Sequence, residues 1–500
     1  MMDGLQNGRI HELLKNGRAK QPAKKTSATP YHKTNKRDFV SAKINRLTSD
    51  WPSTNISADE EVYRSLRVLR ARSRWLYKNN GYYKRYVSMT LDNVIGWQGI
   101  RIEAKIRGRR GTAFDTKVNT EIERAWKRWN KKGNISTREQ INGVDLQRLI
   151  LSGVVVDGEV FLRKRYGVDN GFGYALEIID PMRVPLDYTH QRAKNGNEII
   201  NGIEYANGEA VAYYVVPPGM RYDYDAGQAE RVDAKNILHL FVPELPEQKR
   251  GLPMLSAGMQ KLHMTDKYEM AVVAQARIAA EKGGFFSKGV ADDGFAGNGE
   301  DEEEVEMMDS EIGSFGILPQ GWQFNQFDPQ HPSNALDPFM TKLLRGVASA
   351  GNVNYNSLAN DLSDVNYSSA RIGALEVRSH WRYLQQWMIE WYLEDVYKDW
   401  LRMALSSGAI DLPLSRYNDY LDVSWVPRSW QWVDPQKEAI GYRSQVRMGT
   451  MSLSDVASEQ GRDFADTAER LAKDKEVAEK HGLKLMDVFP VLQQTNASKI

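Results

Sequence analysis

Two carboxylates placed two residues apart are the nearest approach in this sequence to a catalytic pair. Asp157 and Glu159 stand in the run VVVDGEVF, after an apolar stretch typical of a strand. Carboxylates at this spacing can act as general acid and base, or can hold a divalent metal such as Mg²⁺. Asp-Gly is equally an ordinary turn, in which the glutamate would pair with a basic neighbour. The sequence leaves both interpretations open.

Most other catalytic chemistry is excluded by residues that the chain lacks. There is no cysteine, which rules out disulfides, thiolate zinc sites, iron–sulfur clusters and cysteine nucleophiles. No phosphate-binding G-x-x-x-x-G-K-[ST] loop occurs, so the chain does not resemble an ATP motor. The eight histidines are scattered, and neither H-E-x-x-H nor G-x-S-x-G is present. We therefore predict a protein without catalytic residues, cofactor or metal.

Acidic residues form a dense cluster in the second half of the chain. Between Glu281 and Glu311 there are eleven carboxylates and only two lysines. The cluster lacks the spaced oxygen ligands and the central glycine of a calcium-binding loop. A solvated face that repels other negative charge is the simpler interpretation. The densest part of the cluster contains Glu300, Asp301, Glu302, Glu303, Glu304 and Glu306.

Charge is distributed unevenly, although the formal net charge is only +2. Residues 1–150 contain 32 basic and 14 acidic side chains, whereas residues 151–500 contain 35 and 51. Such asymmetry indicates nucleic acid or a charge-complementary partner, or else a solvated surface with a disordered basic arm. Residues 1–37 have few large apolar side chains, so we expect a flexible arm there. The arm could contact phosphates or lie on a neighbouring subunit.

Composition and periodicity predict a soluble α+β protein. Hydrophobic residues make up 41% of the 500 positions, which is enough for a substantial core. No stretch approaches the ~20 apolar residues of a membrane-spanning helix, and the first residues do not resemble a secretory signal. We expect no membrane association.

Helical and strand patterns alternate along the chain. A helical pattern after the cap at Ser57 or Asp59 is broken at Asn79-Asn80-Gly81, and GIRIEAKI alternates as a half-buried strand does. Residues 150–245 are rich in β patterns, with a hairpin signal at Asn207-Gly208. The pattern of residues 370–405 predicts the longest helix. The buried faces predicted for the first and last of these helices contain Val62, Leu66, Leu69, Trp75 and Leu76, and Leu384, Trp387, Met388, Trp391, Val396, Trp400 and Leu401.

Several long motifs, in order along the chain, resemble the lambda-type phage portal proteins. They are LRARSRWLYKNNGYYKRYVSMTLDNVIGWQGIRIEAK, DGEVFLRKRY, EIIDPMRVP, RGLPMLSAGMQKLHMTDKYEMAVVAQARIAAEKGGFF, SDVNYSSARIGALEVR, WVPRSWQWVDPQKEAI and MSLSDVASEQGRDF. The resemblance covers about residues 40–480. It implies the portal fold of wing, stem, clip and crown, assembled as a head-to-tail connector ring of about twelve subunits around an axial channel.

The resemblance also implies how the chain divides. The expected parts are a basic N-terminal arm (1–58), an α/β wing (59–252), a first stem helix (253–282), an acidic clip (283–335), a second stem helix (336–350), a tunnel loop (351–367), a long wing helix and return strand (368–432), a helical crown (433–482) and a C-terminal tail (483–500). Double-stranded DNA would pass through the ring while it is packaged and ejected. The implied partners are the terminase large subunit, a major capsid or scaffold protein and a head–tail adaptor, in the virion and, during assembly, in the host cytoplasm.

Within that plan, physical argument suggests which side chains meet DNA. DNA must slide, so an acidic clip would repel the phosphate backbone from the wall. Lys342 and Arg345, three residues apart on a helix, could face the DNA or make salt bridges between subunits. The asparagines of the tunnel loop could make short neutral contacts, and they are Asn352, Asn354, Asn356 and Asn360. Two other functions stay open: a Mg²⁺-dependent nucleic-acid-processing enzyme that uses Asp157 and Glu159, and a monomeric basic DNA-binding module.

Overall fold

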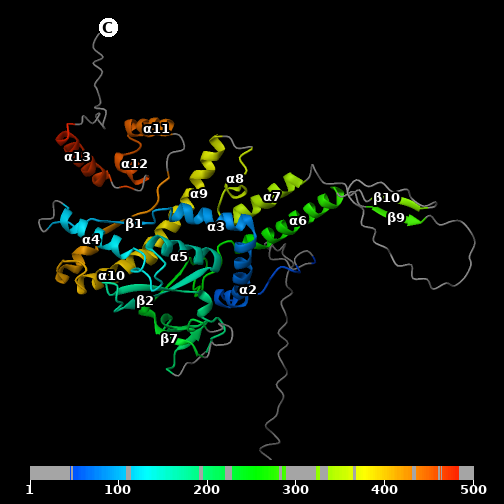
Figure 1. Cartoon of the computed structure of the whole chain (residues 1–500), viewed down its shortest axis with the longest axis horizontal. Helices are drawn as coiled ribbons and strands as arrows, with labels where there is room; N and C mark the ends of the chain where they lie inside the picture. The colour runs from blue at the N-terminus through cyan, green and yellow to red at the C-terminus, as the bar shows by residue number, and fades with distance from the viewer. Residues whose placement is uncertain are drawn as a thin grey trace, which may run out of the picture. The chain divides into compact units, whose positions relative to one another are not determined.

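The computed structural model describes most of the chain outside the two ends and the acidic region. The described residues are 46, 49–108, 114–190, 195–219, 228–280, 284–288, 322–326, 336–363, 367–430, 435–459, 462 and 464–482. Contacts divide the chain into two units, Met1–Ile56 and Ser57–Ile500. In the first unit the described residues include no helix or strand. All elements named below belong to the second unit (Figure 1).

Helices α2 (Ala58–Asn79) and α3 (Gly81–Val94) are separated by one residue that caps both of them. The Ser57 side chain accepts the Glu60 N–H and starts α2. Asn80 is extended, its N–H binds the Leu76 carbonyl, and its side chain accepts the Tyr83 N–H at 2.9 Å. The predicted helix break at Asn79-Asn80-Gly81 is confirmed.

Helix α5 (Gly143–Asp157) leads directly into a three-stranded antiparallel sheet. The sheet has the order β3–β2–β8, with β2 at Glu159–Tyr166, β3 at Tyr174–Ile179 and β8 at Ile237–Phe241. The expectation of a strand before Asp157 was wrong, because the apolar run ending in Val156 closes α5. Gly158 ends that helix in the left-handed conformation, with φ 89°.

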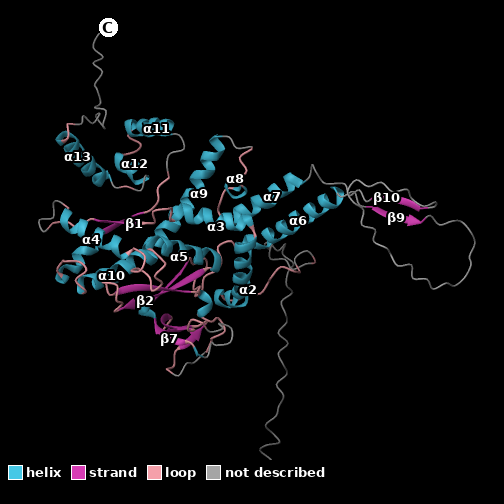
Figure 2. Ribbon diagram, in the orientation of Figure 1, coloured by secondary structure: helices cyan, strands magenta, loops and turns pink. Residues whose placement is uncertain are grey.

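A second antiparallel sheet follows in the order β4–β5–β6–β7. Of its strands, β7 is labelled in Figure 2. Its strands are β4 (Glu198–Ile200), β5 (Ile203–Ala206), β6 (Glu209–Val215) and β7 (Glu230–Asp233). Asn207 and Gly208 join β5 to β6 with φ values of 52° and 84°. Positive φ at both central residues is the signature of a type I′ hairpin turn, so the predicted hairpin is confirmed.

Aromatic side chains form the centre of the main core. Trp126 of α4 (Thr116–Trp129) lies 4.9 Å from Trp400 and 5.7 Å from Trp425, measured between ring centroids. Trp400 is in α10 (Glu394–Ser406) and Trp425 is in β11 (Val423–Val426), which pairs with β1 (Arg101–Ala104). The strand predicted in GIRIEAKI is therefore confirmed. Its partner strand comes from more than 300 residues later in the sequence.

Two helices pack against each other after the sheets. These are α6 (Ser256–Ala280) and α7 (Leu336–Ala350), which run side by side in Figure 1. Beyond them, β9 (Gly284–Lys288) pairs with β10 (Trp322–Gln326).

The remaining elements are α8 (Tyr355–Ala359), α9 (Tyr367–Met388), the π-helix η5 (Ile389–Leu393), α11 (Pro435–Met448), α12 (Leu453–Glu459), α13 (Phe464–Lys480), and the short 3₁₀ segments η2 (Pro181–Arg183), η4 (Ala234–Asn236) and η6 (Leu414–Leu421). Among the described helices, none has the length and apolar composition of a membrane span.

The predicted buried faces are correct except at two tryptophans and at Leu69, which is only partly buried. In α2 the side chains of Val62, Leu66 and Leu76 are buried, and most of the Trp-rich face of α9–α10 is buried as well. Trp75 is 45% exposed, and its ring lies edge-on against His263 of α6. Trp391 is 40% exposed, because the π-helical turn that contains it shifts the helical periodicity.

Candidate functional site

Glu159 lies at the centre of a fully buried cluster of charged side chains. Arg250 donates from Nε to the glutamate at 2.8 Å, and Arg70 forms a second ion pair with it. His239 Nε2 lies 2.9 Å from Oε2, and the Gly251 N–H donates to the same oxygen at 2.9 Å. Arg70, Arg250 and Glu159 are each at most 1% exposed. The carboxylate is therefore enclosed by donors from α2, β8 and the segment before α6.

The electrostatics of this cluster favour an ion pair over a proton donor or a metal ligand. Burial raises the pKa of Glu159, but Arg250 and Arg70, with a hydrogen bond from His239, more than offset that effect. The Glu159 pKa is consequently held well below its ordinary value. Burial also lowers the pKa of His239. The Glu159 carboxylate stays ionised, and both of its oxygens are already occupied.

Asp157 is held in a similar way by a neighbouring arginine. Arg74 donates to both of its carboxylate oxygens, at 2.6 and 2.8 Å, and also to Asp180 at 2.8 Å. Asp157 and Glu159 therefore bind separate arginines and share no open site between them. Within the described ranges, no group of three or more carboxylates and histidines could hold a metal ion. The interpretation in which the glutamate pairs with a basic neighbour is the correct one.

Lys342 and Arg345 both lie on the exposed side of α7. The Arg345 guanidinium stacks over the Tyr355 ring, 5.4 Å from its centroid. Tyr355 donates its hydroxyl to Asp361 at 2.9 Å, so this arginine is part of a local arrangement at the end of α7. Lys342 is exposed about one turn earlier on the same helix.

The four candidate asparagines flank or belong to the short helix α8. Asn352 and Asn360 are exposed and adopt left-handed backbone, with φ of 51° and 55°. Asparagine tolerates this conformation better than most residues, which accounts for its use after α7 and after α8. Asn354 precedes α8 and its side chain lies against Gly373 of α9, while Asn356 is within α8. Structural roles thus account for part of the asparagine enrichment.

Three groups of predicted residues lie outside the described part of the chain. They are the acidic residues Glu300, Asp301, Glu302, Glu303, Glu304 and Glu306, the arm at residues 1–37 and the tail at 483–500. The tunnel-loop interval 351–367 is described only in part, because residues 364–366 are also outside.

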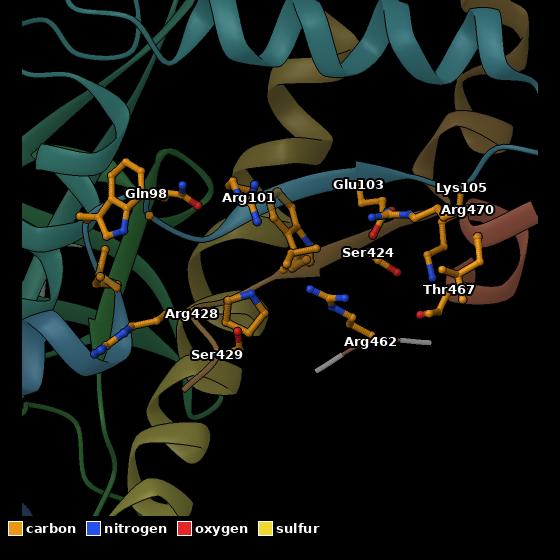
Figure 3. A pocket seen from close by; sticks show the side chains of 18 of the residues that line it. Gln98, Arg101, Glu103, Lys105, Ser424, Arg428, Ser429, Arg462, Thr467 and Arg470 are labelled. Atoms are coloured by element: carbon orange, nitrogen blue, oxygen red, sulfur yellow. The ribbon is translucent and has the colours of Figure 1, made fainter. Parts of the chain in front are cut away.

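Sequence patterns did not indicate a polar pocket between the β1–β11 pair and α13. Its volume is about 1020 Å³, and Figure 3 shows charged side chains from both ends of the chain around it. Arg101 and Glu103 come from β1, Arg428 follows β11, and Arg470 comes from α13 and pairs with Glu103. Each residue taken alone resembles an ordinary surface charge. The pairing of β1 with β11 is what brings them together.

Comparison with known proteins identifies the family of this chain. Residues 45–385 match the family described as "Phage portal protein, lambda family". The chain belongs to the lambda family of phage portal proteins. It is 31% identical over 464 residues to the probable portal protein of Halomonas phage phiHAP-1, which covers 91% of this chain and 88% of that protein. It is 20% identical to portal protein B of Escherichia phage lambda, over 81% of each chain.

Membership of the portal family gives the chain its general role. It is a structural, non-enzymatic component of the virion, at the capsid vertex through which DNA is packaged and ejected. The prediction that it is not an enzyme is confirmed, and so is the family resemblance.

Among solved structures, a chain from the neck of an empty gene transfer agent particle is similar to this one. The identity is 14% and the TM-score is 0.43, and the match covers 80% of this chain and 94% of the other.

Proposed function

We propose that about twelve copies of this portal protein form a ring whose axial channel carries double-stranded DNA. In this proposal the wing comprises residues 59–252 and the long helix with its return strand at 368–432. The helices α6 and α7 form the stem, residues 283–335 the clip, 351–367 the tunnel loop and 433–482 the crown. The terminase large subunit, a head–tail adaptor and the major capsid or scaffold protein would dock on the assembled ring.

The observation that carries the ring is the apolar surface that α6 leaves exposed on two sides. Met270 and Val273, three residues apart on one face, are 62% and 67% exposed. Met264 is 61% exposed and lies about half a turn around the helix from Val273, at 3.6 residues per turn. Full burial of each such side chain is worth roughly 1.5–3 kcal/mol. A subunit in a ring has two neighbours and can bury both faces.

Charged substitutions on this face should therefore break the ring. We expect Met270→Asp/Val273→Asp to shift the native mass from about 684 kDa, for twelve copies of 57.0 kDa, toward the monomer. Circular dichroism should show unchanged helix content, because both side chains are already exposed in one subunit. Native mass spectrometry with negative-stain images makes the measurement. Leu414→Asp, at another half-exposed apolar position, is the matched control. Intact rings in the double variant would contradict the stem interface.

Lys342, and the exposed asparagines Asn352 and Asn360, are the positions best placed to face the DNA in this arrangement. Lys342 lies on the exposed side of α7, and the two asparagines follow α7 and α8. One cation per subunit gives a weak positive ring, whereas a closely lined basic wall would bind phosphates and hinder sliding. Arg345 shares the exposed side of α7, but its stacking on Tyr355 restrains it.

The acidic residues 300–306 would keep the phosphate backbone away from the wall of the clip. Six carboxylates in this run, repeated around a ring, oppose close approach by a polyanion. Replacing Glu302, Glu303 and Glu304 by lysine should therefore lower the yield of packaged DNA at least tenfold while rings still form. An in vitro packaging assay with nuclease-protected DNA measures this effect. Glutamine at the same positions should have a smaller effect, and normal packaging by the lysine variant would refute the repulsion.

A further inference from the structure

A second pocket, with a mostly basic lining, lies between α9 and α11, next to the pocket of Figure 3. Its volume is about 680 Å³, and it is lined by side chains of α9, of residues 427–430 and of α11. We call it the Trp430 pocket. Its basic lining residues are Arg371, Arg378, Arg382, Arg428 and Lys437, against one carboxylate, Glu438. Residues 151–500 as a whole are acidic, so this local excess of positive charge is a departure from its surroundings.

Trp430 is fixed in place at the base of this basic cluster. Its ring stacks on Trp381 with centroids 6.0 Å apart and an angle of 23° between planes. Its indole N–H donates to Asn93 at 2.9 Å, and Arg428 donates to the same asparagine oxygen at 2.7 Å. The guanidinium carbons of Arg378 and Arg382 both lie 5.9 Å from the Trp430 centroid. Two positively charged guanidinium groups therefore lie within cation–π distance of the same aromatic ring.

The arginines of α9 form a straight row. Arg371, Arg378 and Arg382 fall within about 40° of one another around the helix and extend about 16 Å along it. Glu438 pairs with Arg371 at 3.7 Å, at one end of the row. Burial lowers the pKa of Arg378, Glu438 opposes that effect, and Arg382 and Arg428 lower the pKa further. The centre of the row therefore brings the like charges of Arg378, Arg382 and Arg428 close together.

The two pockets are neighbours that share part of their lining. Pro427, Arg428 and Ser429 line both of them, so Arg428 is common to the two linings. The pocket of Figure 3 adds the cations Arg101, Lys105 and Arg462, and its lining also contains the carboxylates Glu103 and Asp474. Cationic side chains thus extend from α9, past β11, toward α13. This path follows an extended polyanion better than a small isolated anion.

From this geometry we infer that the Trp430 pocket binds the phosphodiester backbone of nucleic acid, with Arg378 and Arg382 as its central contacts. Guanidinium groups match phosphate oxygens through paired hydrogen bonds, and phosphates recur every ~3.4 Å along one strand, so the arginine row spans several of them. The inference rests on the proposed passage of DNA but adds a holding site outside the stem helices. Binding at such a site is independent of base sequence.

The test measures binding of a labelled ~30-bp duplex to the assembled protein by fluorescence anisotropy, between about 50 and 200 mM salt. The variant Arg378→Gln/Arg382→Gln removes two positive charges from the pocket. Its control, Arg64→Gln/Arg416→Gln, removes two charges from exposed ion pairs elsewhere. We expect at least a tenfold loss of affinity, and a salt slope shallower by about two, in the pocket variant alone. Arg378→Lys/Arg382→Lys should retain most of the salt slope, because the charge is kept.

Two results would overturn the inference. One is duplex affinity in the pocket variant equal to that of the control, with rings intact by native mass spectrometry. The other is competition by polyglutamate as strong as by unlabelled duplex, which would assign the pocket to acidic protein segments. Failure of the variant and the unmodified chain alike to form rings would instead count against the proposed function. Ring formation is read separately, so the two failures are distinguishable.

Discussion

Replacing Glu159 by glutamine is expected to lower the free energy of unfolding by about 3–5 kcal/mol. Glutamine keeps the size of the side chain but removes its charge. Arg70 and Arg250 would then remain fully buried without the anion that compensates them. Urea unfolding at fixed protein concentration measures the loss. Glu230→Gln is the matched control, because Glu230 pairs with Arg163 at the surface and is 54% exposed, so it should cost less than about 1 kcal/mol.

The difference in unfolding free energy between the parent protein and Glu159→Gln should depend on pH in a defined direction. Because the folded-state pKa of Glu159 is depressed, its stabilisation is complete above the unfolded-state pKa of about 4.3. It is lost as the pH falls through the lower folded-state pKa. The gap between the parent protein and Glu159→Gln should therefore be constant from neutral pH to about pH 5 and should narrow only in stronger acid. A gap that narrowed between pH 7 and 6 would contradict the assignment to Glu159. A gap that widened there would point to His239, because Glu159 raises the pKa of that imidazole and its removal makes protonation of His239 in the folded protein more costly.

Replacing Gly158 by alanine should be at least as damaging, for a steric reason. A Cβ atom at Gly158 would lie 2.6 Å from both the carbonyl carbon and the oxygen of Gly251, and closer still to the Leu252 backbone. The backbone at Gly251 and Leu252 cannot move aside easily, because the Gly251 N–H donates to the buried Glu159. We expect a loss of more than about 4 kcal/mol, seen as a low soluble yield and a thermal midpoint lowered by several degrees.

Gly208→Ala is the control that distinguishes the steric clash at Gly158 from the strain of placing alanine in left-handed backbone. Gly208 has φ of 84°, close to the 89° of Gly158, but a Cβ added there meets nothing within 4 Å. Only the left-handed conformation would be penalised, at roughly 1–2 kcal/mol. Equal destabilisation by the two substitutions would show that the close approach of the 158 and 251 backbones is unimportant.

Much of the local structure could be predicted from sequence, because its causes are local. The helix break at Asn80 depends on a side chain that caps its own neighbourhood, and the hairpin at Asn207-Gly208 on residues that tolerate positive φ. The family resemblance was also visible in ordered motifs. The apolar run before Asp157 was misjudged because a short buried helix and a buried strand have similar composition.

What could not be predicted depends on partners that are distant in sequence. Arg70 is one of several arginines in α2, and nothing near it in the sequence indicates that it is buried. Its partner Glu159 is 89 residues away. The Trp430 pocket is assembled in the same way, from α9, the residues after β11 and α11. Trp430 and the three arginines of its row are common residue types. Their significance appears only when the chain is folded.

The attachment of α6 to the rest of the subunit has a mechanical consequence. Just before this helix, the Gly251 main chain and the Arg250 side chain both bind Glu159 at the start of β2, and Arg250 also donates to the carbonyls of Asn201 and Val184. The helix is therefore anchored at its root to both sheets. Force applied along α6 while DNA moves through the portal would be transmitted through Arg250 and Gly251 to those sheets. These hydrogen bonds would resist bending between α6 and the sheets, whereas a segment without such contacts would allow it.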